Sequence, residues 1–309
     1  MNSFIFPGQG SQYVGMLDQL RNFSIAEKYI EKAKNILGEE FIDVIDNGPE
    51  EMLTLTENAQ PAIFLQSVIS AEILKEMSIL PEIVAGFSLG EFSALHFAGV
   101  MSFEDTLKLV RLRGIEMQKS IEPGKGTMAA IIGLQASDVE KICSEESGCG
   151  DVIVANYNCP GQVTISGIKE AVDFVMKKSL EIGAKKAVQL KVSAPFHTKY
   201  MRGASEKLRE FLENVEIALP KVPVVSNVTA EPYPLDVEGI REYIVIQAVS
   251  PVRWEQSMKN IIELGIEDFY EVGPGKVLTG MMKRIDRKRK CEFTHNILNS
   301  IVEESLINA

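Results

Sequence analysis

The chain has 309 residues, of which 45% are hydrophobic and 24% charged, a balance typical of an ordinary globular protein. Its formal net charge of −11 argues against nucleic acid as the main partner, because acidic proteins and phosphate backbones repel each other. No apolar run approaches the ~18 residues that suggest a membrane span. The start MNSFIFPGQG lacks the basic and apolar regions of a signal peptide. We therefore expect a cytoplasmic protein that binds neither a membrane nor nucleic acid.

The chain has four cysteines, and their spacing bears on metal and redox chemistry. The cysteines are Cys143, Cys149, Cys159 and Cys291. No two of them form a CxxC pair, and their spacing fits neither a zinc site nor a disulfide framework. We expect reduced thiols and no metal.

In the first 122 residues, short apolar runs alternate with amphipathic stretches. The run FIF at 4–6 predicts a core strand, and residues 82–86 predict a second. Residues 56–77 predict a helix with Pro61 in its first turn, where proline is tolerated. Strands that alternate with helices indicate a parallel sheet covered by helices.

Residues 125–194 follow a different pattern. They predict a strand, a helix, two strands around the turn at 159–161, a second helix and a last strand. This βαββαβ order is that of the ferredoxin-like fold. Strands expected at 222–229 and within 266–278 then resume the main pattern, and the tail beyond Asp286 shows little pattern. We therefore predict a large α/β domain, residues 1–124 and 197–309, with an inserted ferredoxin-like subdomain, residues 125–196.

Residues 86–90 read Gly-Phe-Ser-Leu-Gly and lie between an apolar run and a helical segment. A G-x-S-x-G sequence at a strand-to-helix corner is the nucleophile elbow of α/β-hydrolase-like folds, in which the serine hydroxyl stands exposed. The N–H groups at the start of the helix suit a developing oxyanion. The same pattern also occurs where a serine only stabilises a turn. The flanking strand and helix favour Ser88 as a nucleophile, and the large domain as α/β-hydrolase-like.

A serine nucleophile needs a base, and the chain has three histidines. His96 lies eight residues beyond Ser88 on the same helix, about 12 Å along its axis at 1.5 Å per residue, and is expected to be structural. His295 lies in the weakly patterned tail and is expected on the surface. His197 lies where the chain re-enters the large domain, and clefts form at such junctions. We therefore expect His197 to be the base.

Three segments together extend this interpretation: FPGQGSQ at 6–12, GFSLGE at 86–91 and SAPFH at 193–197. With them, residues 3–285 resemble the malonyl-CoA:acyl carrier protein transacylases of fatty acid synthesis and the related acyltransferases of polyketide synthases. Ser88 then matches the acyl-accepting nucleophile and His197 its base.

The resemblance also implies roles for further residues. The backbone N–H groups of Gln9 and Leu89 match the oxyanion donors, and the main-chain carbonyl of Gln247 matches the group that orients the histidine. A third acidic residue is therefore not required.

Arg113 matches the arginine that binds the acyl carboxylate in the family. The helix expected at 103–120 supports this position, because Ser102 and Asp105 resemble a capping box and Arg113 borders an apolar stripe. Arg111 is expected to face solvent. The alternative role for Arg113 is a surface ion pair with Glu116, which would contribute little.

Two positions concern the acyl pocket. Phe87 stands where most of the family has histidine, which changes pocket polarity and leaves the dyad intact. Phe196 stands where a phenylalanine accompanies malonyl selection in the polyketide branch, because its ring crowds an α-methyl group. Asn156, Asn158 and Gln162 are candidates for contacting the pantetheine amides, with turn stabilisation as the alternative.

The resemblance implies transfer of a malonyl group from malonyl-CoA to the phosphopantetheine thiol of acyl carrier protein, by a monomer without metal or other cofactor. A discrete acyltransferase of a polyketide synthase uses the same chemistry and stays open as an alternative. A serine thioesterase or esterase would not need Arg113, and a non-catalytic carrier-protein scaffold would not need the intact serine–histidine pair.

Overall fold

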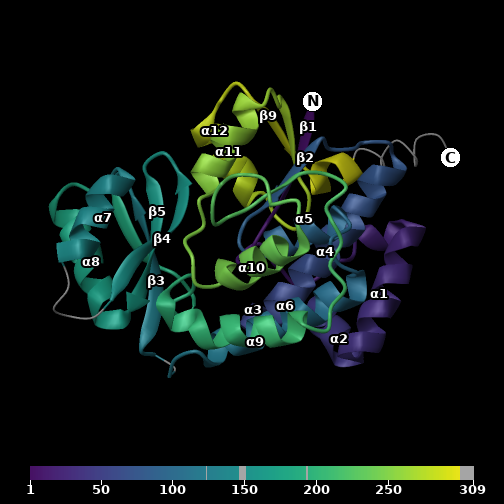
Figure 1. Cartoon of the computed structure of the whole chain (residues 1–309), viewed down its shortest axis with the longest axis horizontal. Coiled ribbons are helices and arrows are strands. Elements are labelled where there is room, and N and C mark those ends of the chain that lie inside the picture. The colour runs from purple at the N-terminus through teal and green to yellow at the C-terminus, as the bar shows by residue number, and fades with distance from the viewer. Residues whose placement is uncertain (123, 146–150, 193, 300–309) are drawn as a thin grey trace.

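The computed structural model describes residues 1–122, 124–145, 151–192 and 194–299. Two β-sheets lie in two parts of the molecule, a parallel sheet surrounded by most of the helices and an antiparallel sheet to one side (Figure 1). This arrangement confirms the predicted α/β fold with a parallel sheet and a separate ferredoxin-like unit. No helix among the described residues is long and apolar enough to cross a membrane.

The large sheet has the order β7-β2-β1-β8-β9, and all of its strand pairs are parallel. Its strands are β1 (Asn2–Phe6), β2 (Ile83–Gly86), β7 (Val224–Val225), β8 (Asp268–Glu271) and β9 (Lys290–Phe293). The central strands are almost fully buried, which explains why they appear in the sequence as continuous apolar runs.

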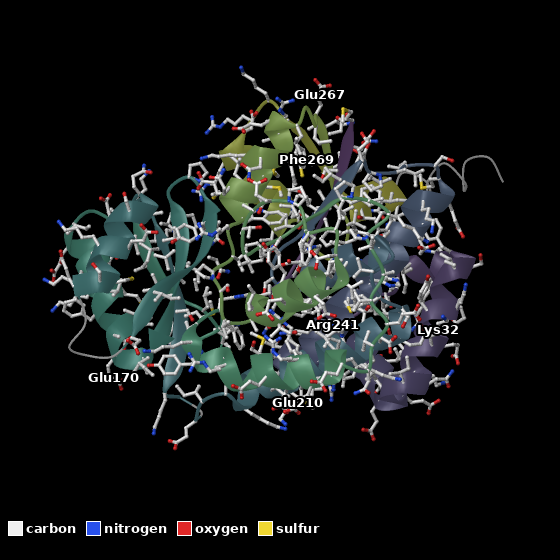
Figure 2. All side chains as sticks on the ribbon, viewed as in Figure 1. Lys32, Glu170, Glu210, Arg241, Glu267 and Phe269 are labelled. Carbon is white, nitrogen blue, oxygen red and sulfur yellow. The ribbon has the colours of Figure 1, made fainter. Side chains whose placement is uncertain are left out.

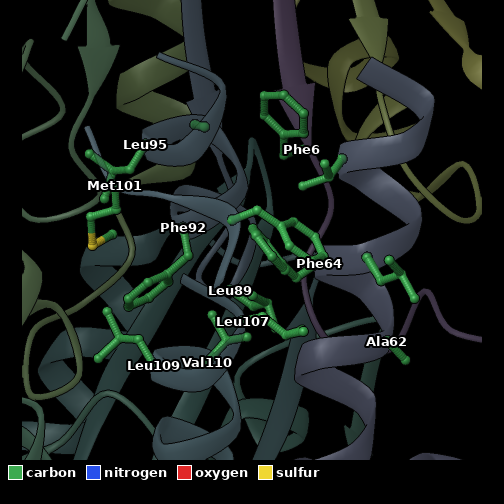
Figure 3. Packing of buried hydrophobic residues seen from close by; sticks show 14 of the residues in the cluster. Phe6, Ala62, Phe64, Leu89, Phe92, Leu95, Met101, Leu107, Leu109 and Val110 are labelled. Carbon is green, nitrogen blue, oxygen red and sulfur yellow. The ribbon is translucent and has the colours of Figure 1, made fainter. Parts of the chain in front are cut away.

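Alternate residues of β1 belong to two different cores, as the period of two in a strand requires. Phe4 and Phe6 join the larger cluster with Phe64 and Phe92, part of which Figure 3 shows. Ile5 points to the other face and packs with Trp254. Ten helices accompany the sheet within the described residues: α1 (Ser24–Leu37), α2 (Glu39–Asn47), α3 (Glu50–Thr54), α4 (Thr56–Glu76), α5 (Gly90–Phe97), α6 (Phe103–Lys119), α9 (Arg202–Leu212), α10 (Val237–Gln247), α11 (Trp254–Glu263) and α12 (Val277–Ile285).

Charged side chains lie mainly on the outside of the molecule, as Glu170, Glu210 and Glu267 illustrate (Figure 2). Phe269 of β8, by contrast, is only 1% exposed.

The antiparallel sheet has the order β4-β5-β3-β6, which is the strand order of a ferredoxin-like fold. Its apolar core is separate from those of the parallel sheet. Its elements are β3 (Gly126–Ile132), α7 (Ala136–Glu145), β4 (Val152–Cys159), β5 (Gln162–Ile168), α8 (Lys169–Glu181) and β6 (Lys186–Gln189). The residue bounds of the two domains stay a prediction.

Two expectations about local structure were wrong, and one strand was not predicted. The strand expected at 222–229 is limited to β7, because the chain turns back after Val225, where Ala230 N donates to Ser226 O at 2.8 Å. β9 was missed because its alternating charged residues look like surface. Pro61 lies inside α4 and not in its first turn.

The carbonyl that this proline leaves without its usual N–H partner belongs to Glu57, four residues earlier. Arg111 of α6 donates to it at 2.6 Å and to Asn58 Oδ1 at 2.5 Å. Arg111, expected to face solvent, is therefore half-buried and joins α6 to α4.

The turn between β2 and α5 is unusually close-packed. A Cβ on Gly86 would lie 1.9 Å from the carbonyl carbon of Gly90, and a Cβ on Gly90 would lie 2.0 Å from Phe6 O. Between the two glycines, Ser88 has φ of 51°, in the left-handed region that side-chain-bearing residues rarely adopt. Both glycines are therefore required by the close approach of α5 to β1 and β2.

We predict that Gly86→Ala lowers the free energy of unfolding by roughly 3 kcal/mol or more, because backbone must move to admit the methyl group. Thermal or urea unfolding measures the effect. The matched control is Gly203→Ala in α9, where an added Cβ meets nothing within 4 Å. It should leave stability unchanged or raise it by up to about 1 kcal/mol. Equal destabilisation by both substitutions would contradict this account of the elbow.

Candidate active site

A cavity of about 330 Å³ lies where the parallel strands end and the antiparallel sheet begins. Ligands bind in such crevices beyond the carboxyl ends of parallel strands. The loop after β1, the elbow, α6, β4 and the segment after β6 all contribute to its wall. The lining includes Gln9, Gln60, Phe87, Ser88, Arg113, Met128, Asn156, Leu190, Phe196 and His197.

Ser88 and His197 meet in this cavity. The Oγ of Ser88 lies 2.7 Å from Nε2 of His197, and the other ring nitrogen lies 3.1 Å from the carbonyl oxygens of Gln247 and Ser250. Because carbonyl oxygens only accept hydrogen bonds, Nδ1 carries the proton and Nε2 is left to accept the serine proton. The sequence anticipated the Gln247 carbonyl and missed that of Ser250.

Two hydrogen bonds fix the segment that carries His197. The histidine has φ of 60° and is 2% exposed. Ser166 Oγ of β5 donates to the carbonyl of Phe196 at 2.7 Å and links the segment to the antiparallel sheet. Within the segment, Thr198 Oγ1 donates to Pro195 O at 2.6 Å and closes the turn around the histidine.

The electrostatics keep His197 in its neutral form. Burial and, after it, the nearby positive charge of Arg113 together lower its pKa to about 3, against the smaller effect of the two carbonyl partners. A neutral imidazole is the form that can remove a proton from a serine hydroxyl.

Gln9 lines the cavity of Ser88, and Leu89 follows the serine in the chain. The loop that carries Gln9 approaches the elbow so closely that a Cβ on Gly8 would lie 2.4 Å from Phe87 O. Leu89 is the N-cap residue of α5. Within the described residues, neither main-chain N–H donates a hydrogen bond. Both donors are therefore free for an oxyanion.

Arg113 is 1% exposed, far more buried than its position beside the apolar stripe of α6 indicated. Its Nη2 donates to Ser88 Oγ at 3.2 Å and to Gln247 Oε1 at 2.9 Å, and its Nη1 donates to Gln60 Oε1 at 2.9 Å. Phe92 lies beneath the guanidinium, with its ring centroid 5.2 Å from Cζ. The N-cap bond from Asp105 N to Ser102 Oγ, at 3.0 Å, fixes the start of α6.

The remaining sequence candidates lie in two adjoining cavities. Phe196 and Asn156 line the cavity of Ser88, whereas Asn158 and Gln162 line a neighbouring cavity of about 220 Å³ that shares Asn156 with it. Gln162 Oε1 accepts from Arg284 at 2.5 Å. The side-chain oxygens of Asn156 and Asn158 are buried and have no partner among the described residues.

Three polar residues around the nucleophile were missed from the sequence. Asn227 Oδ1 accepts from Ser88 N at 2.8 Å, while its Nδ2 donates to Gly86 O at 2.6 Å. Glu91 lies behind the elbow and accepts from Gln247 Nε2 at 2.9 Å. Gln60 contacts Arg113. Of these three residues, only Glu91 could have been found from the sequence, because it is a charged residue at the start of a largely apolar helix.

The other histidines and cysteines lie elsewhere. His96 Nδ1 donates to Met101 O at 3.0 Å, away from the cavity, and His295 is exposed. Cys149 lies outside the described residues, and the other three cysteines are free. Among the described residues, no group of three or more His, Cys, Asp or Glu side chains could hold a metal ion.

A serine paired with a histidine at the elbow of a parallel sheet is the arrangement of an acyl-transfer enzyme. The family model described as acyl transferase domain matches residues 3–295. A malonyl CoA-acyl carrier protein transacylase of Bacillus subtilis is 41% identical over 93% of this chain and 91% of its own length. The corresponding transacylase of Salmonella typhimurium is 43% identical, over 92% of each chain.

Two solved structures that resemble this chain are also malonyl transacylases. An acyl-carrier-protein S-malonyltransferase from Burkholderia pseudomallei superposes with a TM-score of 0.93 at 38% identity, over 96% of this chain and 99% of the other. A malonyl-transacylase in complex with a type II polyketide synthase acyl-carrier protein superposes with a TM-score of 0.90 at 39% identity, over 94% of both chains. The chain belongs to the malonyl CoA-acyl carrier protein transacylases of the acyl transferase domain family, which confirms the resemblance.

We predict that acylation of Ser88 by acetyl-CoA is independent of pH near neutrality and falls only in acid, because the charged form of His197 is disfavoured by burial and by Arg113. Arg113→Ala removes a neighbouring positive charge, so the pKa of His197 rises and the acid limb of kcat/KM moves to higher pH. Acetyl-CoA is used because its acyl group has no carboxylate for the arginine. An acid limb that stays at the same pH in the variant would contradict this electrostatic coupling.

Proposed function

We propose that the chain transfers a malonyl group from malonyl-CoA to the phosphopantetheine thiol of acyl carrier protein in fatty acid biosynthesis, through an acyl-enzyme on Ser88. One observation carries the proposal: a fully buried guanidinium, that of Arg113, faces the serine hydroxyl. Burying a cation is unfavourable unless it binds an anion, and the free carboxylate of malonate matches a guanidinium with two hydrogen bonds.

In the first half-reaction, His197 Nε2 takes the proton of Ser88 while Oγ attacks the thioester carbonyl carbon. The N–H groups of Gln9 and Leu89 hold the oxyanion. The carbon–sulfur bond then breaks, and coenzyme A leaves as a thiol with the proton from His197. In the second half-reaction His197 takes the proton of the carrier-protein thiol while its sulfur attacks the ester carbonyl carbon. The bond from that carbon to Ser88 Oγ then breaks, and His197 gives the proton to Oγ.

Side chains around the cavity select the acyl group and hold the thioester arm. Arg113 binds the carboxylate, and its 3.2 Å contact with Ser88 is the weakest of its bonds and the one that the acyl group replaces. Phe196 restricts room beside the malonyl α-carbon. Asn156, Asn158 and Gln162 contact the pantetheine amides, and the unpaired oxygens of the two asparagines support this role.

The proposal includes no metal or other cofactor beyond the coenzyme A thioester, and action as a cytoplasmic monomer without nucleic acid or membrane. The net charge of −11 supports the absence of nucleic acid. An acidic carrier protein needs a local basic surface. The candidates are exposed residues, of which Lys191 lines the cavity: Lys185, Lys186, Lys191, Lys199, Lys283, Arg284 and Arg287.

A discrete acyltransferase of a polyketide synthase is the second candidate. The similarity to the transacylase in complex with a polyketide carrier protein favours it. A serine thioesterase or hydrolase finds no support, because a neutral acyl chain has no use for Arg113.

We predict that Ser88→Ala abolishes acyl-enzyme formation, because the nucleophile is removed. Intact-protein mass spectrometry after mixing with malonyl-CoA should show an adduct on the wild type alone. An equal malonyl adduct on the variant would place the nucleophile elsewhere.

We predict that Arg113→Ala lowers kcat/KM for malonyl-CoA by roughly a hundredfold or more, from the loss of two charge-assisted hydrogen bonds, and changes that for acetyl-CoA much less. Half-reaction kinetics with both thioesters measure the ratio. Arg111→Ala is the matched control, since this arginine binds α4 outside the cavity. Equal losses for both thioesters would rule out the carboxylate-binding role.

A further inference from the structure

The positive charge of Arg113 has no carboxylate in direct contact within the described residues. Its three hydrogen-bond acceptors are the neutral groups of Gln60, Gln247 and Ser88. A charge that is 1% exposed in this way is costly unless an opposite charge lies close by.

The nearest opposite charge is that of Glu91, which is separated from Arg113 by the side-chain amide of Gln247. Glu91, in the first turn of α5, is also 1% exposed, and its Oε2 accepts from Gln247 Nε2 at 2.9 Å. The same amide nitrogen donates to Ser88 O at 2.7 Å. Because both partners of the nitrogen only accept, the amide oxygen of Gln247 must point to Arg113, which only donates.

The carboxylate of Glu91 has further hydrogen-bond donors besides Gln247. Tyr233 donates its hydroxyl to Oε1 at 2.5 Å, and Asn227 N lies 3.3 Å from both carboxylate oxygens. Glu91 therefore has a fixed position and a complete set of donors, although nothing in the reaction described above uses it.

We propose that Glu91 is a positioning residue that balances the charge of Arg113 through the side-chain amide of Gln247 and thereby sets how tightly the acyl-enzyme holds a carboxylate. The inference rests on the proposed malonyl transfer. A direct Glu–Arg pair would occupy the guanidinium and would have to be broken by each incoming malonyl group. The intervening amide leaves the side of Arg113 that faces Ser88 open.

This arrangement has an electrostatic consequence. A malonyl carboxylate on Arg113 is a second negative charge near Glu91, and the two repel when Glu91 is ionised. Burial raises the pKa of Glu91 to about 7, against the lowering by its hydrogen bonds and by Arg113. An acetyl group brings no such charge. The preference for malonyl over acetyl should therefore fall as the pH rises and Glu91 ionises.

Other titratable groups near this cluster act differently. Tyr233, with Tyr243 beside it, has a pKa raised well above its usual value and stays neutral. His197 has its pKa lowered to about 3 and serves both acyl groups alike, so its titration cancels in the malonyl-to-acetyl ratio. Arg113 stays charged, since its pKa is lowered only to about 10.

The test measures the equilibrium occupancy of Ser88 by malonyl and acetyl groups, from malonyl-CoA and acetyl-CoA, between about pH 6 and 8.5. In the wild type the malonyl-to-acetyl ratio should fall about tenfold over this range. In Glu91→Gln the ratio should be independent of pH and equal to the wild-type value at the low end. A glutamine retains an acceptor for Gln247 and removes only the charge.

Two further variants keep the test decisive. Glu271→Gln is the matched control, because Glu271 is also buried with a raised pKa, yet it bonds Leu278 N and Thr279 at the start of α12. It should leave the ratio and its pH dependence as in the wild type. Tyr233→Phe removes a donor that favours ionised Glu91, so the pKa rises and the fall in the ratio moves to higher pH.

A ratio that depends on pH equally in Glu91→Gln and the wild type would overturn the inference, as would a wild-type ratio that does not change with pH. If Glu91→Gln fails to fold, an unshifted profile in Tyr233→Phe overturns it. Failure of the proposed function itself would look different, because the wild type would then form no malonyl adduct on Ser88 at any pH.

Discussion

The whole site depends on how closely the start of α5 is pressed against β1 and β2. Only glycine fits at positions 86 and 90, and the serine between them is held at φ of 51°. Such a backbone conformation is unfavourable and persists only where its surroundings fix it. Asn227 provides that restraint, because it bonds the N–H of Ser88 and the carbonyl of Gly86 with one side chain. The hydroxyl of Ser88, the proposed nucleophile, is thus positioned by backbone geometry before any substrate arrives.

Burial lowers the pKa of both basic side chains of the site, His197 and Arg113, but only His197 loses its charge as a result. It makes the protonated form of His197 unfavourable, which leaves a base. It does not deprotonate Arg113, whose pKa stays near 10, so the guanidinium remains available to an anion. The positive charge of Arg113 also adds to the lowering at His197. One cavity is therefore lined by an uncharged imidazole and a permanent cation.

The parts of the fold that rest on local patterns could be predicted from the sequence. The run at 4–6 gave β1 because both faces of the strand are buried, and Ser102 marked the start of α6 because its side chain caps the helix. The pairing of Ser88 with His197 was reached by choosing among three histidines. Contacts that only the folded chain creates could not be predicted. Asn227 is 139 residues from Ser88, and no local pattern connects them. β9 was also missed, because its alternating charged residues look like surface and its pairing with β8 exists only in the folded chain.

The bond from Ser166 to the carbonyl of Phe196 ties the histidine to the inserted subdomain. Ser88 comes from the part of the molecule built on the parallel sheet, and the segment of His197 is fixed in part by the antiparallel sheet. A chimera that exchanges the antiparallel sheet between relatives should therefore exchange the alignment of the proposed base as well as the cavity wall. We expect sequence divergence in this sheet to change the catalytic rate even where the elbow sequence stays unchanged.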